Sequence, residues 1–275
     1  MGNLKIFLHG VAFLGHNFEW MLSDTSEEIV PTDYQGLTKS FRHGKIYCSS
    51  ITARLVNLKL GIPWAMLPVL SLNQKINISG IYITCLDANH CLGSIMILFE
   101  PPNGKAVLHT ADFRNSEEMA SMSLWNACPI NTLILDTTHC NPQERKGYSW
   151  RSRVSFVERF TAAKLRLLEC LGFSEEDMQW FTSNDQKSQI HVVPMWTLAI
   201  FKRLKHSSSQ RRFSLVVAFF PTGWSVGKGK KKSPGRRWQQ GTIRRYEVPY
   251  SEHSNFSELR DFVKLVSPEN ITKCK

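Results

Sequence analysis

The feature that most constrains the fold of this chain is the stretch from Ile81 to Arg114. It contains three β-branched and apolar runs that predict short strands separated by turns: Ile81–Leu86, Ser94–Glu100 and Ala106–Thr110. His90 and Gly93 lie in the tight loop after the first strand, and Asp112 comes just after the third. A hairpin of this kind can bring an imidazole and a carboxylate to one rim.

An imidazole and a carboxylate at one rim are ligands that suit zinc. Taken alone, a histidine and an aspartate at strand ends are more often loop residues whose hydrogen bonds are satisfied. Gly93 allows the backbone of the loop to approach a neighbouring group closely. The pattern therefore indicates a possible metal rim without establishing one.

Other segments have clear periodicity. Ser50–Leu60 has apolar residues at helical spacing and ends at Gly61, which predicts a helix. A compact apolar strand at Asn131–Asp136 presents Asp136 at its carboxyl end. Near the end of the chain, His253 lies in a loop before a helix for which Ser257 is the expected cap.

The second half of the chain contains two further predicted strands and a basic loop. The apolar run Phe213–Phe220 predicts a central strand, and Gly241–Val248 a strand with charge on one face. Between them, Gly227–Arg237 gathers six cations, which suits phosphate neutralisation. The residues expected to contact DNA are the cations of this loop and an aromatic side chain that could stack on bases: Lys228, Lys230, Lys231, Lys232, Arg236, Arg237 and Trp238. A solvated loop or a nuclear-import signal would explain the same run.

Composition agrees with a polyanionic partner. The 275 residues carry a formal net charge of +11, which favours nucleic acid, although general solubility explains it as well. No apolar run approaches the ~20 residues that cross a bilayer, so no membrane partner is expected.

Four phrases carry a family resemblance: ANHCLGS around His90, HTADFR around Asp112, LDTTHCNP around Asp136 and PYSEHSNF around His253. They resemble motifs of the DNA cross-link-repair nucleases, most of all those of plants. This group, which includes Artemis and the nitrogen-mustard-sensitivity exonucleases, belongs to the β-CASP branch of the metallo-β-lactamase superfamily. The resemblance implies an α/β fold: a metallo-β-lactamase-like αββα sandwich with a truncated β-CASP insertion.

The same resemblance implies a division of the chain. Residues 1–31 are unassigned, 32–143 form a partial metallo-β-lactamase domain, 144–188 a remnant of the β-CASP region, and 189–275 the C-terminal DNA-repair segment.

The resemblance also implies the chemistry. Family members use zinc to hydrolyse DNA from a 5′ end during cross-link and double-strand-break repair in the nucleus. The expected metal ligands here are His90, Asp112 and Asp33, and the expected catalytic residues are Asp112, Asp136 and His253. The expected partner is DNA with single-stranded or damaged ends.

The chain departs from the family pattern in its metal loop. Where the family has a His-x-His-x-Asp-His loop, this chain reads SDTSEEIVPTDYQGLTKSF, and the stretch Glu144–Thr161 is rewritten. Ala111 stands before Asp112 where the family has glycine, and adds a Cβ where the backbone can require a positive φ. Two hypotheses follow: a weakened or inactive zinc-dependent exonuclease, or a non-catalytic nucleic-acid- or partner-binding relative. RNA processing by the same superfamily is a third hypothesis, and the wording of the motifs LDTTHCNP and PYSEHSNF argues against it.

Overall fold

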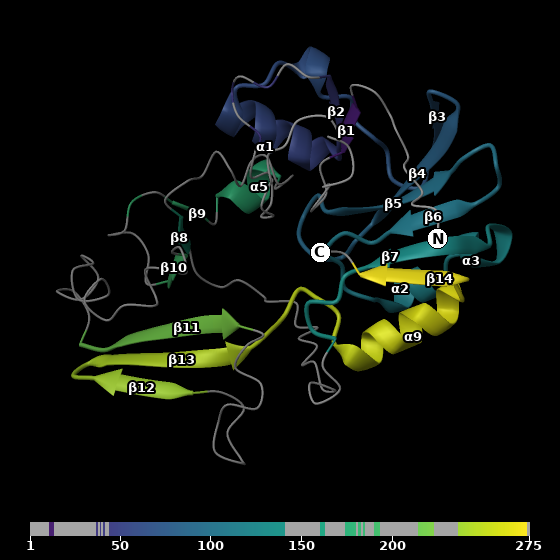
Figure 1. The fold of residues 1–275 in the computed structure, drawn as a ribbon. Coiled ribbons are helices and arrows are strands. Elements are labelled where there is room, and N and C mark those ends of the chain that lie inside the picture. Colours follow the sequence, from purple (N-terminus) through teal and green to yellow (C-terminus); the bar gives the residue numbers. More distant parts are fainter. Residues whose placement is uncertain are drawn as a thin grey trace. The chain divides into compact units, whose positions relative to one another are not determined.

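The computed structural model of the chain divides into two compact units, and each is described by itself (Figure 1). Unit 1 comprises Met1–Arg145 and Glu252–Lys275, and unit 2 comprises Lys146–Ser251. The structure describes residues 11–13, 37, 39, 41, 44–140, 160–162, 174–179, 181–182, 184, 190–192, 214–222 and 236–273. No helix among these residues is long and apolar enough to cross a membrane.

A six-stranded sheet is the centre of unit 1, with the order β14-β7-β6-β5-β4-β3. Strands β3 to β6 pair antiparallel, and β7 then joins β6 and β14 in parallel. Its strands in chain order are β3 (Lys75–Ile78), β4 (Ile81–Asp87), β5 (Ile95–Glu100), β6 (Ala106–His109), β7 (Ile130–Leu135) and β14 (Asn270–Lys273). The strands predicted at β4, β5, β6 and β7 are confirmed to within a residue or two at each end.

Helices cover one face of this sheet. Alternate strand residues such as Leu98, Leu108 and Leu133 pack against α2 (Glu117–Ala120), α3 (Leu124–Ala127) and α9 (Phe256–Val266). Phe262 of α9 is fully buried against Phe113, with ring centroids 4.7 Å apart. The packing fixes α9, and with it the loop that precedes α9, against the strand ends.

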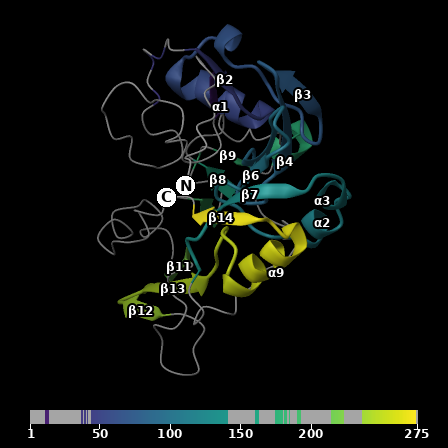
Figure 2. The same ribbon diagram turned by 45° about the vertical axis from the view of Figure 1, so that its right-hand side comes forward.

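A small sheet and a helix form the remaining layers. Strand β1 (Val11–Phe13) pairs in parallel with β2 (Lys45–Tyr47). Ile46 packs with Ala53 and Val56 of α1 (Ser50–Leu60), whereas Tyr47 packs against the apolar face of the large sheet. The layers are therefore helices, sheet, small sheet and helix, as Figures 1 and 2 show, and the predicted α/β sandwich is confirmed.

Helix ends follow the expected chemistry in one case and correct it in another. Helix α1 has the predicted bounds, with a side-chain cap at Ser49 and a left-handed Gly61 after its end. At α9 the predicted cap Ser257 is wrong. Asn255 is the cap, because its side chain accepts the amides of Ser257 and Glu258 while Glu258 returns a bond to the amide of Asn255.

The described residues of unit 2 form two three-stranded sheets and a helical turn. One has the order β10-β8-β9, formed by β8 (Phe160–Ala162), β9 (Phe181–Thr182) and β10 (Ile190–Val192). The other has the order β11-β13-β12, formed by β11 (Val216–Thr222), β12 (Arg237–Gln240) and β13 (Ile243–Pro249). The turn α5 (Glu175–Met178) begins after Ser174, whose side chain caps it.

The expectation that the apolar run near Phe220 is a central strand is wrong for the described part of the sheet. Strand β11 pairs there with β13 alone, so it is an edge strand. The apolar run misled because continuous hydrophobicity suggests burial on both faces, whereas Val217 and Phe219 are 43% and 62% exposed.

Candidate functional site

The chain direction of the strands in unit 1 brings three loops to one edge of the large sheet. Strands β4 and β6 both pair antiparallel with β5, so they are parallel to each other, and β7 is parallel to β6. The carboxyl ends of β4, β6 and β7 therefore meet at one edge, and they are followed by His90, Asp112 and Asp136 respectively.

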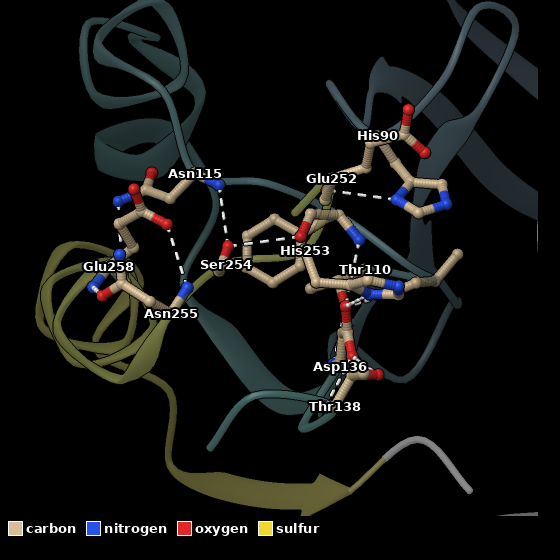
Figure 3. A network of polar contacts seen from close by, with 12 residues as sticks. His90, Thr110, Asn115, Asp136, Thr138, Glu252, His253, Ser254, Asn255 and Glu258 are labelled. Atoms are coloured by element: carbon tan, nitrogen blue, oxygen red, sulfur yellow. Dashed lines mark hydrogen bonds and ion pairs between the residues drawn. The ribbon is translucent and has the colours of Figure 1, made fainter. Parts of the chain in front are cut away.

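The loop before α9 is hydrogen-bonded to the same edge (Figure 3). The amide of Ser254 donates to the carbonyl of Phe113 over 3.0 Å, and the amide of Asn115 donates to the Ser254 hydroxyl over 2.8 Å. The amide of Arg114 donates to the carbonyl of Ala88 over 2.9 Å. These bonds join the loops that carry His90, Asp112 and His253.

The His90 ring has a defined tautomer. Its Nδ1 lies 3.1 Å from the carbonyl oxygen of Glu252, and because a carbonyl can only accept, Nδ1 must donate. In the neutral ring the other nitrogen, Nε2, then carries the lone pair. Histidines that bind metals commonly donate their second ring nitrogen to such an oxygen.

A close approach at Gly93 holds the His90 loop in place. The carbonyl of Gly93 accepts from the hydroxyls of Ser49 and Thr52 at the start of α1, over 2.7 and 3.2 Å. The backbone φ is +90°, and a Cβ here would lie 2.9 Å from the Cβ of Ile51. The predicted close approach is confirmed, and the group approached is the start of α1.

His253 has the same arrangement as His90, with a buried carboxylate as its partner. Its Nδ1 lies 2.7 Å from Oδ2 of Asp136, which is 3% exposed. Oδ1 of Asp136 accepts from the amide and hydroxyl of Thr138, over 2.9 and 2.7 Å. In Figure 3 Asp136 lies beneath the His253 ring, so this aspartate orients the histidine.

The electrostatics of Asp136 follow from these bonds. Burial alone would raise the pKa of this carboxyl group, but the hydrogen bonds from His253 and Thr138 outweigh burial and hold the pKa below its ordinary value. Asp136 is therefore an anion at neutral pH, which suits a carboxylate that supports a histidine.

Three of the predicted site residues form a possible metal-binding group. His90, Asp112 and His253 each offer one ligand atom, and these atoms all lie within 4.8 Å of one another. The ring centroids of His90 and His253 are 4.6 Å apart. Ligands about 2 Å from one zinc stand roughly 3.3 Å apart in a tetrahedral arrangement, so shifts of about 1 Å would close the group around an ion. Two imidazoles and a carboxylate are a donor set that zinc accepts.

The backbone before Asp112 has the positive φ that the family's glycine at position 111 suggested. Ala111 is buried and has φ of +51°, in the left-handed region that favours glycine. The strained residue directs Asp112 toward the two histidines. The chain keeps the conformation without the glycine that would relieve it.

Two buried histidines near the rim were not predicted as site residues. His139 packs its ring edge against His253 with centroids 5.8 Å apart. His109 is 2% exposed and accepts the Ala111 amide at Nδ1 over 2.9 Å, and its burial lowers its pKa to about 4. His109 lies in the phrase HTADFR and His139 in LDTTHCNP, so the motifs pointed to both histidines. The motifs did not show that these histidines are buried.

The remaining predicted site residues are Asp33 and the proposed DNA contacts. Asp33 and the lysines of the basic loop, Lys228, Lys230, Lys231 and Lys232, lie outside the described residues. Arg236 pairs with Glu247 over 3.1 Å, Arg237 is exposed, and the Trp238 ring lies 4.2 Å from the Arg245 guanidinium carbon. Trp238 and Arg237 are neighbours in a strand, so they lie on opposite faces of it.

Comparison with known proteins agrees with the motifs. Residues 175–273 match the DNA repair metallo-beta-lactamase family. The chain is 34% identical to the DNA cross-link repair protein SNM1 of Arabidopsis thaliana, over 86% of this chain and 57% of the relative. It is 30% identical to the DNA cross-link repair 1A protein of Homo sapiens, over 86% and 26%. It is 28% identical to the 5' exonuclease Apollo of Rattus norvegicus, over 81% and 45%.

A structural comparison supports the fold alone. A protein of unknown function from Enterococcus faecalis V583 matches with a TM-score of 0.52 and 12% identity, over all of this chain and 77% of that chain. The chain spans between about a quarter and three fifths of the three relatives. Over most of its length the chain is therefore similar to the DNA cross-link-repair group of metallo-β-lactamase-like proteins.

Proposed function

We propose that this chain is a metal-dependent DNA phosphodiesterase that shortens DNA from a 5′ end during repair of interstrand cross-links and double-strand breaks in the nucleus. The observation that carries the proposal is the convergence of His90, Asp112 and His253, with Asp136 buried behind His253. The proposed partner is DNA with single-stranded or damaged ends.

The residues of the rim have separate proposed roles. His90 and His253 would hold a zinc ion through Nε2, because Nδ1 of each donates to an oxygen of the protein. Asp112 would supply the carboxylate ligand. A zinc ion held by three protein ligands keeps an open position and supplies a Lewis acid with a bound water that ionises near neutral pH.

Asp136 acts in this proposal through His253. Its Oδ2 accepts a hydrogen bond from Nδ1 of His253 over 2.7 Å and so keeps Nε2 directed at the rim. The hydrogen bonds from Thr138 keep the carboxylate itself in one position. Asp136 is thus a positioning residue here, although the family motif suggests a catalytic one.

The activity is expected to be weak. The family resemblance implies two zinc ions. Where the family has its His-x-His-x-Asp-His metal loop, this chain reads SDTSEEIVPTDYQGLTKSF and lacks the histidines. A single ion cannot clamp both the attacking and the leaving oxygen of the phosphate, as a metal pair does. Asp33, proposed as a further ligand, would raise the count of ligands without restoring the lost histidines.

The missing His-x-His-x-Asp-His loop favours a second candidate function. A chain without the histidine loop could bind nucleic acid or a partner without cleaving it. The lysines at 228 and 230–232 are proposed DNA contacts under either function, and neutralising Lys230–Lys232 tests them through the salt dependence of binding.

A digestion assay separates the two functions. The substrate is a 5′-phosphorylated single strand labelled at its 3′ end, incubated with zinc-loaded protein and, in parallel, with chelator. The first function predicts slow, chelator-sensitive shortening that His90→Ala abolishes. His191→Ala, a change at a half-buried histidine of β10, is the matched control and should leave the rate unchanged. Binding without shortening at any zinc concentration would favour the second function.

A further inference from the structure

The sheet β11-β13-β12 of unit 2 has one face that is open to solvent. Register places Phe219, Tyr246 and Arg237 side by side across the three strands, and Val217, Arg244 and Gln239 in the neighbouring row. Partners in register point to the same side of a sheet, so these six side chains share one face. They are called the platform below.

The two faces of this sheet differ in burial. On the platform, Phe219 is 62% exposed and Val217 43% exposed, and Arg237, Gln239 and Arg244 are exposed as well. On the opposite face, Ala218 and Ile243 are 5% and 0% exposed and form a small core with Val216. The opposite face is therefore the packed one, and the apolar side chains of the platform remain at the surface.

Aromatic and cationic groups alternate on the platform. The Phe219 and Tyr246 rings are stacked, with centroids 5.8 Å apart and planes 25° from one another. Arg237 and Arg244 flank them, and none of the described strand residues that share this face is acidic. Glu247, the acid of this sheet, lies on the opposite face and pairs with Arg236.

We propose that the platform binds single-stranded DNA. The exposed Phe219 ring and the half-buried Tyr246 ring have similar planes and offer surfaces on which unpaired bases stack. The two guanidinium groups lie where the backbone phosphates of such a strand would run. A duplex buries the faces of its bases, so it cannot use the rings. An apolar protein partner would leave the two arginines without anions, since this face provides none.

The inference deepens the proposed function, because it names a surface for the strand on which the chain would act. It is independent of cleavage and of metal, so binding is measured with chelator present. The probe is a fluorescein-labelled 20-residue oligo-dT, titrated with the full chain and followed by fluorescence anisotropy over a range of salt concentrations.

Phe219→Ala is expected to weaken oligo-dT binding on the order of tenfold, because one stacked base is lost. Phe219→Trp should restore the affinity, since it replaces one ring with another. Tyr82→Ala is the matched control, because Tyr82 is an aromatic residue 49% exposed beside Lys75 in unit 1, and it should bind as wild type does. Unchanged thermal unfolding of the variants would show that the sheet remains folded.

The arginines are tested through salt. Arg237→Gln or Arg244→Gln should each lower the slope of log affinity against log salt by about 0.7, the value for one phosphate contact on a single strand. Arg260→Gln, at an exposed arginine of α9, should leave the slope unchanged. Wild-type binding by Phe219→Ala and both arginine variants would overturn the proposal. So would preference for oligo-U over oligo-dT, or an effect of Phe219→Ala on self-association alone.

Discussion

Replacing Asp136 by asparagine tests whether the carboxylate behind His253 organises the rim. Each carboxylate oxygen of Asp136 accepts from two donors: Oδ2 from His253 Nδ1 and the Phe113 amide, and Oδ1 from the amide and hydroxyl of Thr138. An asparagine has one oxygen, so whichever way its amide turns, one of the two pairs of donors faces an NH₂ group.

The expected loss of stability follows from this count. Asp136 is 3% exposed, so water cannot replace the lost acceptor. Each buried donor left unsatisfied costs ~1–3 kcal/mol, and hydrogen bonds to a charged acceptor are the stronger kind. We expect Asp136→Asn to lower the free energy of unfolding by about 2–4 kcal/mol. The affinity for zinc should fall by roughly 10–100-fold, the usual loss when the partner of a metal-binding histidine is changed.

The change should also alter the acid limb of the stability profile. Because the folded pKa of Asp136 is lowered, its stabilising contribution is present above the unfolded pKa and is lost as pH falls through the folded pKa. Asp136→Asn should therefore remove part of the loss of stability that the wild type shows below about pH 4.

Urea unfolding at pH 7 and at several acidic pH values, followed by near-ultraviolet circular dichroism, measures both effects. Asp261→Asn is the matched control, because Asp261 is an exposed aspartate of α9 paired with Arg260, and it should change stability by less than about 0.5 kcal/mol. An Asp136→Asn protein that unfolds within 0.5 kcal/mol of wild type, with an unchanged acid limb, would refute the reasoning.

Three further predictions concern the surroundings of the rim. His109 has a folded pKa of about 4 against an ordinary value of 6.5, so between these pH values the unfolded chain binds one more proton than the folded chain. The free energy of unfolding should therefore fall by about 3 kcal/mol as pH drops from 6.5 to 4. Acid unfolding curves of His109→Gln should not show this decrease. Ala111→Gly should raise the free energy of unfolding by roughly 0.5–1 kcal/mol in urea, because glycine accepts the positive φ; a loss of stability would contradict the strain. Asn255→Ala should cost about 1 kcal/mol in the same assay and Ser257→Ala less than about 0.5, and the reverse order would restore Ser257 as the cap.

Local patterns predicted much of the fold. The strands β4 to β7 were recognisable because β-branched and apolar runs alternate there with turn residues, and α1 because Gly61 ends a periodic segment. The cap of α9 was misplaced by two residues, since Asn255 and Ser257 are both good caps and sequence alone does not say which side chain turns back.

The site depended on contacts that local patterns do not contain. His90 meets the carbonyl of Glu252, 162 residues along the chain, so their approach was predictable from the family motifs alone. His253 was predicted to be a catalytic residue, and that role stays a prediction; the structure places its ligand atom within 4.8 Å of those of His90 and Asp112. The spacing of the histidines gives no sign of this.

The platform was missed although a signal was present. Arg237 and Trp238 were assigned together as DNA contacts, yet adjacent strand residues point to opposite faces. Recognising β12 as a strand would have separated them and paired Arg237 with Tyr246. The run of glycines and lysines before it suggested an irregular loop that continues through Arg237.

The measurement that tests the central claim most directly is zinc stoichiometry and affinity, by titration into metal-free protein with a competing chromophoric chelator. Our account predicts one zinc per chain, with affinity sharply reduced in His90→Ala, Asp112→Asn and His253→Ala and unchanged in His191→Ala. A chain that binds no zinc, or that binds it equally well without His253, would contradict the account.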